Sequence, residues 1–260
     1  MKHHFKKKFG QNFLTDKNII KKIVDLTDLN KNDLVIEVGP GSGNMTEVLL
    51  SKTRVLAYEI DVELEEPLNE RFRDNQDLTL MFSDFLKSDL KETLSKYKYE
   101  SLYFIANLPY YITTPIITKL IEEKIDFKKI VVMVQKEVGD RMAASPGSKD
   151  YSSLTVFLNY YFNVKKEFLV SRKVFFPSPN VDSVIISFES KERELNNREE
   201  EVFLKLVRDS FKQKRKTLKN NLKDYDLNTV FEILTSKGYS ETVRAEEISL
   251  KDFIEIAKKI

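Results

Sequence analysis

Cysteine and tryptophan are absent from the 260 residues, and histidine occurs only at His3 and His4. The lack of cysteine excludes a disulfide framework and a thiolate zinc site. The position of both histidines leaves none for catalysis or metal binding in the rest of the chain, so we expect no metal ion. No apolar run approaches the roughly 18 residues of a membrane helix. The basic start, residues 1–8, lacks the apolar core of a signal peptide. These absences predict a cytoplasmic protein that does not enter a membrane.

The charges are nearly balanced, with a net charge of +2, but they are unevenly distributed. Residues 1–22 hold seven lysines against one acid, and residues 205–223 hold eight lysines or arginines against one acid. Two basic clusters on a nearly neutral chain suggest a surface that faces a polyanion, although two solvated faces would give the same pattern.

Apolar runs alternate with helical periodicity along the first 190 residues. The predicted strands are 34–38, 54–59, 78–82, 102–106, 130–134 and 184–188. The predicted helices lie near 17–26, 45–50, 67–73, 113–123, 135–142 and 151–162. This alternation predicts an α/β fold with a Rossmann-like, doubly wound and mostly parallel sheet.

A glycine-rich loop, Gly39-Pro40-Gly41-Ser42-Gly43, follows the first of these strands and leads into a helix. Glycines at this point let the backbone approach a ligand and expose helix N-terminal amides. The strand 54–59 ends on Glu59, about 20 residues after the first glycine, where an acid is placed to accept from a ribose diol. The two features together indicate a cofactor that contains adenosine. A tight turn beside a surface acid is the simpler alternative.

Two further strand ends carry polar groups. Asp84 follows the strand 78–82, where it either accepts from an adenine amine or caps a turn. Asn107-Leu108-Pro109-Tyr110 follows the strand 102–106 and precedes a helix. Pro109 fixes its own φ and extends Leu108, so their carbonyls lie in a rigid turn beside the flat face of Tyr110. Acceptors and a flat aromatic ring suit a planar substrate with an exocyclic amine, such as adenine. A structural turn with a buried Tyr110 is the simpler alternative for this motif alone.

The C-terminal part reads as a separate helical domain. The charge-rich segment 189–201 serves as a linker, so the predicted domains are 1–190 and 191–260. Phe203, Leu206, Val207 and Phe211 form an apolar stripe at helical spacing. Basic residues recur on another face of the same predicted helix, at Arg208, Lys212, Arg215 and Lys219. We expect this stripe to contact RNA phosphates, together with Lys7 and Lys8.

Taken together, the motifs resemble the ribosomal RNA adenine N6-dimethyltransferase family over essentially the whole chain. The matching segments are Gly10-Gln11-Asn12-Phe13-Leu14, Glu37-Val38-Gly39-Pro40-Gly41, Glu59-Ile60-Asp61, Asn107-Leu108-Pro109-Tyr110 and Phe175-x-Pro177-x-Pro179-x-Val181. Segments 135–138 and 148–154 are similar to the small-subunit type within that family.

The resemblance implies a class I methyltransferase fold, S-adenosylmethionine as cofactor and 16S rRNA of the 30S subunit, or its precursor, as partner, with the protein acting as a monomer. The cofactor residues carried over by position are Asn12, Leu14, Gly39, Gly41, Glu59, Asp84 and Asn107. The target implied is a pair of adjacent adenosines in a hairpin loop near the 3′ end of 16S rRNA. Each would receive two methyl groups, with a role in small-subunit biogenesis.

The expected chemistry is a direct methyl displacement by the adenine N6. Asn107 and the carbonyl of Leu108 or Pro109 would accept from N6–H, which is positioning and electrostatics rather than strong base catalysis. Tyr110 and Phe175 would stack on the base, with Phe175 preferred over Phe176 because it occupies the first position of the F-x-P-x-P pattern.

Three other functions remain open from the sequence. The first is the erythromycin-resistance type of methyltransferase, which has a similar fold and modifies one adenosine of 23S rRNA. The second is a mainly non-catalytic ribosome assembly factor that has kept the fold. The third, a nicotinamide dehydrogenase, is disfavoured because the glycine spacing is G-x-G-x-G rather than G-x-G-x-x-G.

Overall fold

The computed structural model describes residues 12–260. The predicted RNA contacts at Lys7 and Lys8, and Gly10 and Gln11 of the first motif, therefore lie outside the described residues. Contacts within the chain define two compact units. Unit 1 contains the described residues up to Gly139 together with 165–190, and unit 2 contains 140–164 together with 191–260. The chain passes from unit 1 to unit 2 between residues 190 and 191, which is where the sequence placed the domain boundary. Residues 140–164, which the sequence placed in the first domain, group with the C-terminal helices instead.

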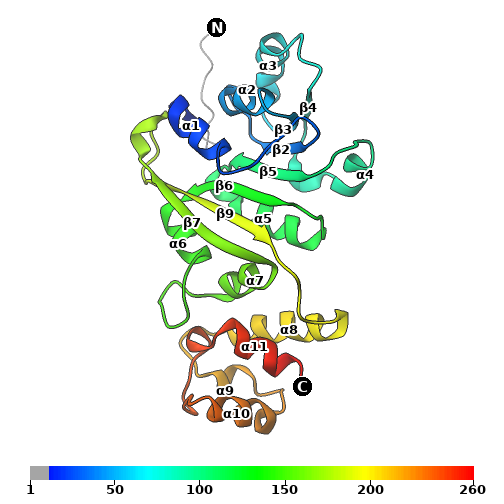
Figure 1. Ribbon diagram of the computed structural model, residues 1–260. Coiled ribbons are helices and arrows are strands. Elements are labelled where there is room, and N and C mark those ends of the chain that lie inside the picture. The colour runs from blue at the N-terminus through cyan, green and yellow to red at the C-terminus, as the bar shows by residue number, and fades with distance from the viewer. Residues whose placement is uncertain (1–11) are drawn as a thin grey trace. The chain divides into compact units, whose positions relative to one another are not determined.

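The main sheet has seven strands in the order β4-β3-β2-β5-β6-β9-β7 (Figure 1). Their bounds are β2 Leu34–Val38, β3 Arg54–Glu59, β4 Leu78–Phe82, β5 Leu102–Asn107, β6 Lys129–Gln135, β7 Phe162–Val170 and β9 Ser183–Ser190. Strands β4, β3, β2, β5 and β6 pair in parallel, and β9 runs antiparallel to β6. The predicted mostly parallel, doubly wound sheet is confirmed, and β2, β3 and β4 occupy the predicted residues.

Four helices connect successive parallel strands: α2 Asn44–Leu50, α3 Glu65–Arg71, α4 Leu90–Leu94 and α5 Thr113–Glu122. Helix α1 Lys17–Val24 precedes β2, and α6 Lys136–Met142 follows β6. The start of α1 is set by Asp16, whose Oδ1 accepts from the backbone amides of Asn18 at 2.9 Å and Ile19 at 3.2 Å. Its apolar face packs into the unit 1 core through Ile20, Ile23 and Val24. Apolar side chains on the sheet and α1 thus hold the strand ends in place.

Three strands escaped the sequence prediction. β7 is at the edge of the sheet and carries Lys165, Lys166 and Glu167, so it lacks the apolar character of the inner strands. Charged residues are common on edge strands because they discourage pairing with other chains. β1 (Phe13–Leu14) and β8 (Phe175–Phe176) have two residues each and form an antiparallel ladder. Strands this short leave no periodic signal.

Unit 2 is mainly helical. Its helices are α7 Ser153–Tyr161, α8 Asn197–Ser210, α9 Leu218–Asn221, α10 Leu227–Ser236 and α11 Leu250–Ala257, the last four in yellow to red in Figure 1. Val156 and Tyr160 of α7 share one core with Phe203 and Leu206 of α8 and Phe253 of α11. This packing explains why 140–164 belongs with the C-terminal residues.

The continuous basic helix predicted through 208–219 is wrong. α8 ends at Ser210, and a turn-rich segment separates it from α9. The side-chain amide of Asn221 donates to the carbonyl of Ser210 at 2.6 Å and to that of Gln213 at 3.2 Å, which satisfies the end of the helix. The basic side chains at Arg208, Lys212, Arg215 and Lys219 are all exposed, but they lie on a helix end, a loop and a short helix.

Candidate active site

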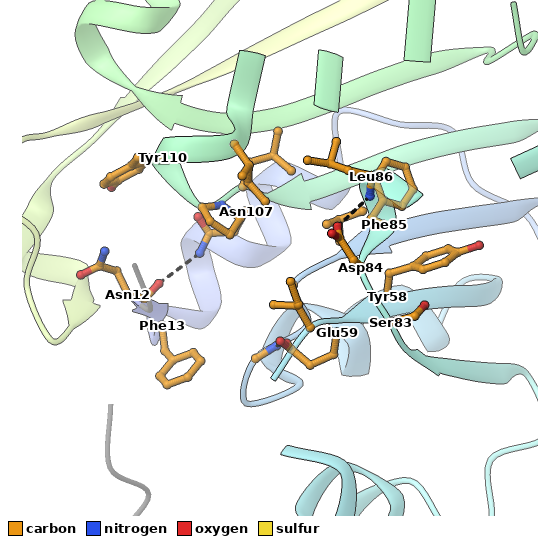
Figure 2. A pocket seen from close by; sticks show the side chains of 17 residues that line it. Asn12, Phe13, Tyr58, Glu59, Ser83, Asp84, Phe85, Leu86, Asn107 and Tyr110 are labelled. Carbon is orange, nitrogen blue, oxygen red and sulfur yellow. Dashed lines mark hydrogen bonds between the residues drawn. The ribbon is translucent and has the colours of Figure 1, made fainter. Parts of the chain in front are cut away.

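Four neighbouring strands of the sheet, β4, β3, β2 and β5, lead at their carboxyl ends to Asp84, Glu59, Gly39 and Asn107. Open α/β sheets bind ligands at this edge. A pocket there is lined by residues from all four strand ends (Figure 2). The lining residues are Asn12, Phe13, Val38, Gly39, Gly41, Tyr58, Glu59, Ile60, Ser83, Asp84, Phe85, Leu86, Asn107, Leu108, Pro109, Tyr110 and Ile112. The structure therefore brings nine of the predicted site residues together.

The glycine loop passes beneath Phe13. Gly39 and Gly41 have φ of +75° and +57°, a region that side chains strain to adopt. A Cβ at Gly41 would lie 2.5 Å from the Phe13 ring, so no larger residue fits without displacing it. The amide of Gly39 donates to the Tyr58 carbonyl at 2.9 Å, which ties the loop to the end of β3. A loop without side chains is thereby held against the pocket wall.

Glu59 is a buried carboxylate at the floor of the pocket. Its Oε2 accepts from the Gly41 amide at 3.2 Å and its Oε1 from the Asp61 amide at 2.9 Å. Burial raises the pKa of Glu59 above its usual value, while the backbone donors work in the opposite direction. The carboxylate is thus fixed in orientation and has remaining acceptor capacity for hydroxyl groups.

A second acid, Glu37, is buried behind the loop and was not assigned a role from sequence beyond its place in a motif. It is 1% exposed, and its Oε2 accepts from the Thr46 hydroxyl at 2.7 Å. Among the described residues, its Oε1 has no hydrogen-bond partner. Desolvation raises the pKa of Glu37 to about 8, with a smaller contribution from the charge of Glu59. At neutral pH Glu37 is therefore mainly protonated.

Asp84 both caps a turn and faces the pocket. Its Oδ1 accepts from the Leu86 amide at 3.0 Å, opening the short 3₁₀ helix Phe85–Lys87 (Figure 2). The side chain is partly buried and remains a lining group. Phe85, Leu86 and Ile60 add apolar surface near the two acids, and each follows a predicted acid closely in sequence. These three residues were not predicted to line the site. Their position just after Glu59 and Asp84 was the one sequence signal that could have identified them.

Asn107 ends β5 and is anchored by the opposite side of the pocket. Its Nδ2 donates to the Asn12 carbonyl at 3.2 Å, which leaves Oδ1 as the acceptor on the other branch of the amide (Figure 2). The next amide, of Leu108, donates to the Met133 carbonyl on β6 at 3.3 Å. The turn is therefore held by two neighbouring segments, as a rigid acceptor site requires.

The two carbonyls of this turn differ. The Pro109 carbonyl accepts from the Ile112 amide at 3.1 Å and from the Thr113 hydroxyl at 3.4 Å, because it starts the helical segment that follows. The Leu108 carbonyl precedes that segment. Of the two acceptors left open by the sequence, Leu108 is the better candidate for a ligand.

Tyr110 lines the end of the pocket near Asn107 and Asn12 (Figure 2). Its hydroxyl is 2.8 Å from the hydroxyl of Ser183, the first residue of β9. Burial raises the pKa of Tyr110 above its usual value, so the phenol is neutral over the physiological range. Ser183 was not predicted, since it is far from Tyr110 in sequence. The hydrogen bond fixes the ring while leaving it part of the pocket wall.

Two predicted site residues do not line the pocket. Leu14 is buried in the core of unit 1, and its carbonyl accepts from the Asn44 side chain at 3.0 Å. Phe175 pairs with Leu14 and is 4% exposed, whereas Phe176 is 62% exposed. The Phe175 ring therefore shows no open face to a base in this structure, and stacking by it requires the ring to leave the core.

The described residues contain no cluster of acids, histidines or cysteines suited to a metal ion. Within residues 12–260, the helices are too short or too polar to span a bilayer.

Comparison with known proteins gives a consistent result. The chain matches the family "Ribosomal RNA adenine dimethylase" over residues 2–260. "Ribosomal RNA small subunit methyltransferase A" of Lactococcus lactis subsp. lactis is 45% identical over 262 residues, which covers 98% of this chain and 89% of the relative. The protein of the same name from Streptococcus pyogenes serotype M5 is 43% identical over 263 residues, covering 97% and 91%.

Solved structures agree with these sequence matches. A dimethyladenosine transferase from Plasmodium falciparum superposes with a TM-score of 0.77 at 28% identity, covering 94% of this chain and 95% of that one. The 23S rRNA methyltransferase ErmE superposes with the same TM-score of 0.77 at 24% identity, which supports the fold alone. The fold is that of class I S-adenosylmethionine-dependent methyltransferases, and the chain belongs to the ribosomal RNA adenine dimethylase family.

Proposed function

We propose that this protein transfers methyl groups from S-adenosylmethionine to N6 of two adjacent adenosines in the 3′-terminal hairpin loop of 16S rRNA. Each adenosine receives two methyl groups, and the 30S subunit or its precursor is the substrate. The observation that carries the proposal is the single pocket that joins Glu59 and Asp84 at one end to Asn107 and Tyr110 at the other. The protein would act in the cytoplasm, as a monomer, and take part in small-subunit biogenesis.

The residues at the first end of the pocket fit the cofactor. Glu59 has oriented carboxylate oxygens for ribose hydroxyls, and Asp84 has an acceptor for the adenine amine. Gly39 and Gly41 line the pocket with backbone alone, so the cofactor's amino-acid portion could approach that backbone closely, and Asn12 lines the same pocket. When bound, S-adenosylmethionine supplies an electrophilic methyl group on a sulfonium. The resemblance also assigns Leu14 to this site. Its side chain is buried, so it would contribute only through its backbone and by positioning its neighbour Phe13, which lines the pocket.

The residues at the other end orient the nucleophile. The N6 lone pair of adenine is delocalised into the ring, so the amine attacks only if it becomes more pyramidal. Asn107 Oδ1 and the Leu108 carbonyl would each accept one N6–H, which directs the lone pair toward the methyl group. Because Asn107 Nδ2 is already bound to the Asn12 carbonyl, the amide cannot rotate without losing that bond.

The reaction balances without a strong base. The N6 lone pair forms the new N–C bond while the S–C bond breaks, and the sulfur leaves as a neutral thioether. The methylated nitrogen then releases a proton to water. No histidine or cysteine is present in residues 12–260 to act as a base. After the first transfer N6 carries one methyl group and one hydrogen. In the second round only one of the two acceptors would therefore be engaged, and the pocket must leave room for the methyl group beside the other.

Base stacking would come from Tyr110, whose hydroxyl bond to Ser183 fixes the ring. An extruded base stacked on an aromatic side chain gains roughly 1–3 kcal/mol. Phe175, the other residue assigned to the stack, would need to turn out of the core to take part. Tyr110 is therefore the primary platform.

Unit 2 supplies the proposed contact with rRNA phosphates. Arg208, Lys212, Arg215 and Lys219 are exposed on the end of α8, the following loop and α9. Lys219 is 3.6 Å from Glu241, but both side chains are mainly solvated, so this ion pair is weak and competes poorly with a phosphate. Lys7 and Lys8 would add to the basic surface.

Radiolabelled methyl transfer to undermethylated 30S subunits, and in parallel to 23S rRNA, tests the proposal. We expect label on 30S subunits, mapped to two adjacent dimethyladenosines. Label on 23S rRNA alone would assign the chain to the resistance type. Cofactor binding without label on either RNA would leave an assembly role as the function.

A further inference from the structure

An exposed aromatic ring lies next to the pocket wall and has no part in the reaction described above. In the β1–β8 ladder, Phe13 pairs with Phe176 and Leu14 pairs with Phe175. Side chains alternate along a strand, so Phe175 turns into the core and Phe176 turns to solvent, with 62% of its surface exposed. Phe176 is therefore presented outward beside Phe13, a residue that lines the pocket.

Residues 172–183, which we call the β8 loop, are tied to the base-binding end of the pocket. Ser183, at one end of the loop, shares the 2.8 Å hydrogen bond with Tyr110. At the other end, the Arg172 amide donates to Asp182 Oδ1 at 2.9 Å, and Arg172 Nη1 donates to the Asn180 carbonyl at 3.0 Å. These bonds close the loop on itself, so it forms a defined surface adjoining Tyr110.

The surface of the β8 loop is cationic and apolar. Arg172 and Lys173 are exposed, and Val181 of the same loop is 43% exposed. The single acid of the loop, Asp182, is already an acceptor for the Arg172 amide. Proteins that bind unpaired nucleic acid combine such cations with aromatic side chains on which bases stack. Lysine is depleted at protein–protein interfaces, so Lys173 favours nucleic acid over a protein partner.

We propose that the β8 loop binds the unpaired RNA strand next to the target adenosine, with Phe176 stacking on the neighbouring base and Lys173 contacting a phosphate. This inference rests on the proposed function, because it assumes an RNA base in the pocket. It adds a site for the nucleotide that is not being methylated. The two target adenosines are adjacent. When one of them is in the pocket, Phe176 would stack on the other target adenosine. When that second adenosine is in the pocket, Phe176 would stack on the next nucleotide of the strand.

The aromatic contact is tested with Phe176→Ala and Phe176→Tyr in the full-length protein. A lost stack should lower kcat/KM for undermethylated 30S subunits by about 5-fold or more. The Kd for S-adenosylmethionine should stay unchanged, and Phe176→Tyr should restore transfer. Tyr99→Ala is the matched control, because Tyr99 is a 37% exposed aromatic that precedes β5, at the opposite ends of the strands from the pocket.

The cationic contact is tested by the salt dependence of 30S binding. Lys173→Gln should reduce the slope of log Kd against log salt by about 1, as expected for one lost phosphate contact. Lys91→Gln, an exposed lysine on α4, should leave the slope unchanged. Equal slopes for both variants would show that Lys173 does not contact an RNA phosphate.

Failure of this inference differs from failure of the proposed function. If the unmodified protein methylates 30S subunits and Phe176→Ala has the same kcat/KM, the stacking role is refuted and the proposed function stands. If Phe176→Tyr does not rescue Phe176→Ala, or if Phe176→Ala lowers the Tm, the residue has a packing role and the inference fails. If the unmodified protein methylates neither RNA, filter binding of 30S subunits tests the RNA-binding role of the β8 loop separately. Phe176→Ala should then bind 30S subunits more weakly than the unmodified protein, and equal binding would refute the inference.

Discussion

Glu37→Gln should remove a pH dependence from the stability of unit 1. The wild-type carboxyl has its pKa raised from 4.5 to about 8, because it is buried and only one oxygen has a donor. The folded protein therefore holds a proton between pH 4.5 and 8 that the unfolded chain has released. Since the folded state binds more protons, the free energy of unfolding falls as pH rises through this window and levels off above pH 8.

The size of the effect follows from the two pKa values. The interval between 4.5 and about 8 corresponds to about 5 kcal/mol in total, at 1.36 kcal/mol per pKa unit. Between pH 6 and pH 9 the wild-type protein should lose about 2–3 kcal/mol from this group alone. Glutamine has nearly the same shape, can still accept from Thr46 and does not ionise. It carries a constant cost of about 1–3 kcal/mol for a buried amide, which is independent of pH.

The assay is urea unfolding at pH 6 and pH 9, with hydrogen exchange in β2 reporting on unit 1. The difference in unfolding free energy between wild type and Glu37→Gln should shift by about 2–3 kcal/mol in favour of the variant at pH 9. Glu66→Gln, an exposed acid on α3, is the matched control and should follow the wild type. Parallel pH profiles for wild type and Glu37→Gln would refute the reasoning, since they would mean that Glu37 ionises at its ordinary pKa.

Three further predictions concern the proposed site. Asn107→Ala should lower kcat by about 100-fold or more while the protein still folds, and near-normal turnover would exclude the N6–H acceptor mechanism. Gly41→Ala should weaken S-adenosylmethionine binding by about 10-fold or more, measured by calorimetry, because its backbone has φ +57° and its Cβ meets a neighbouring ring; an unchanged Kd would show that the loop adapts. Cofactor affinity should fall as pH is lowered through the raised pKa of Glu59, since hydroxyl donors bind the ionised carboxylate, and Glu59→Gln should abolish that dependence.

A last prediction concerns unit 2. Charge reversal at Arg215 and Lys219 should flatten the salt dependence of 30S binding, with a slope lower by about 2 if each contacts one phosphate. An unchanged slope would show that neither Arg215 nor Lys219 contacts a phosphate.

The sheet and most of the pocket could be predicted because their signals are local. Each of Gly39, Glu59, Asp84 and Asn107 directly follows an apolar run or lies within two residues of its end. Parallel strands place such positions at one edge regardless of the details of packing. The same logic explains why the predicted strands β2, β3 and β4 agree with the structure residue for residue.

The missed features depend on contacts between residues far apart in sequence. The side chain of Asn221 satisfies the carbonyl at the end of α8. The periodic spacing of the basic residues predicted a helix that continued beyond this end. The orientations of Phe175 and Phe176 are set by pairing with Phe13 and Leu14, more than 150 residues earlier, as the ladder register shows. A motif identifies such residues but does not say which ring faces outward.

The hydrogen bonds of the pocket also have a consequence for the order of assembly during synthesis. The proposed cofactor end is closed by residues near one another in the chain, such as Gly41 and Glu59, which are 18 positions apart. The proposed base end is closed by Asn12 with Asn107, 95 positions apart, and by Tyr110 with Ser183, 73 positions apart. Chains emerge from the N-terminus first, so the methyl-donor half has its partners early, and the acceptor half must wait until β9 has been made. If the proposed site is correct, a nascent chain could therefore hold the cofactor well before it could hold the target base of the RNA.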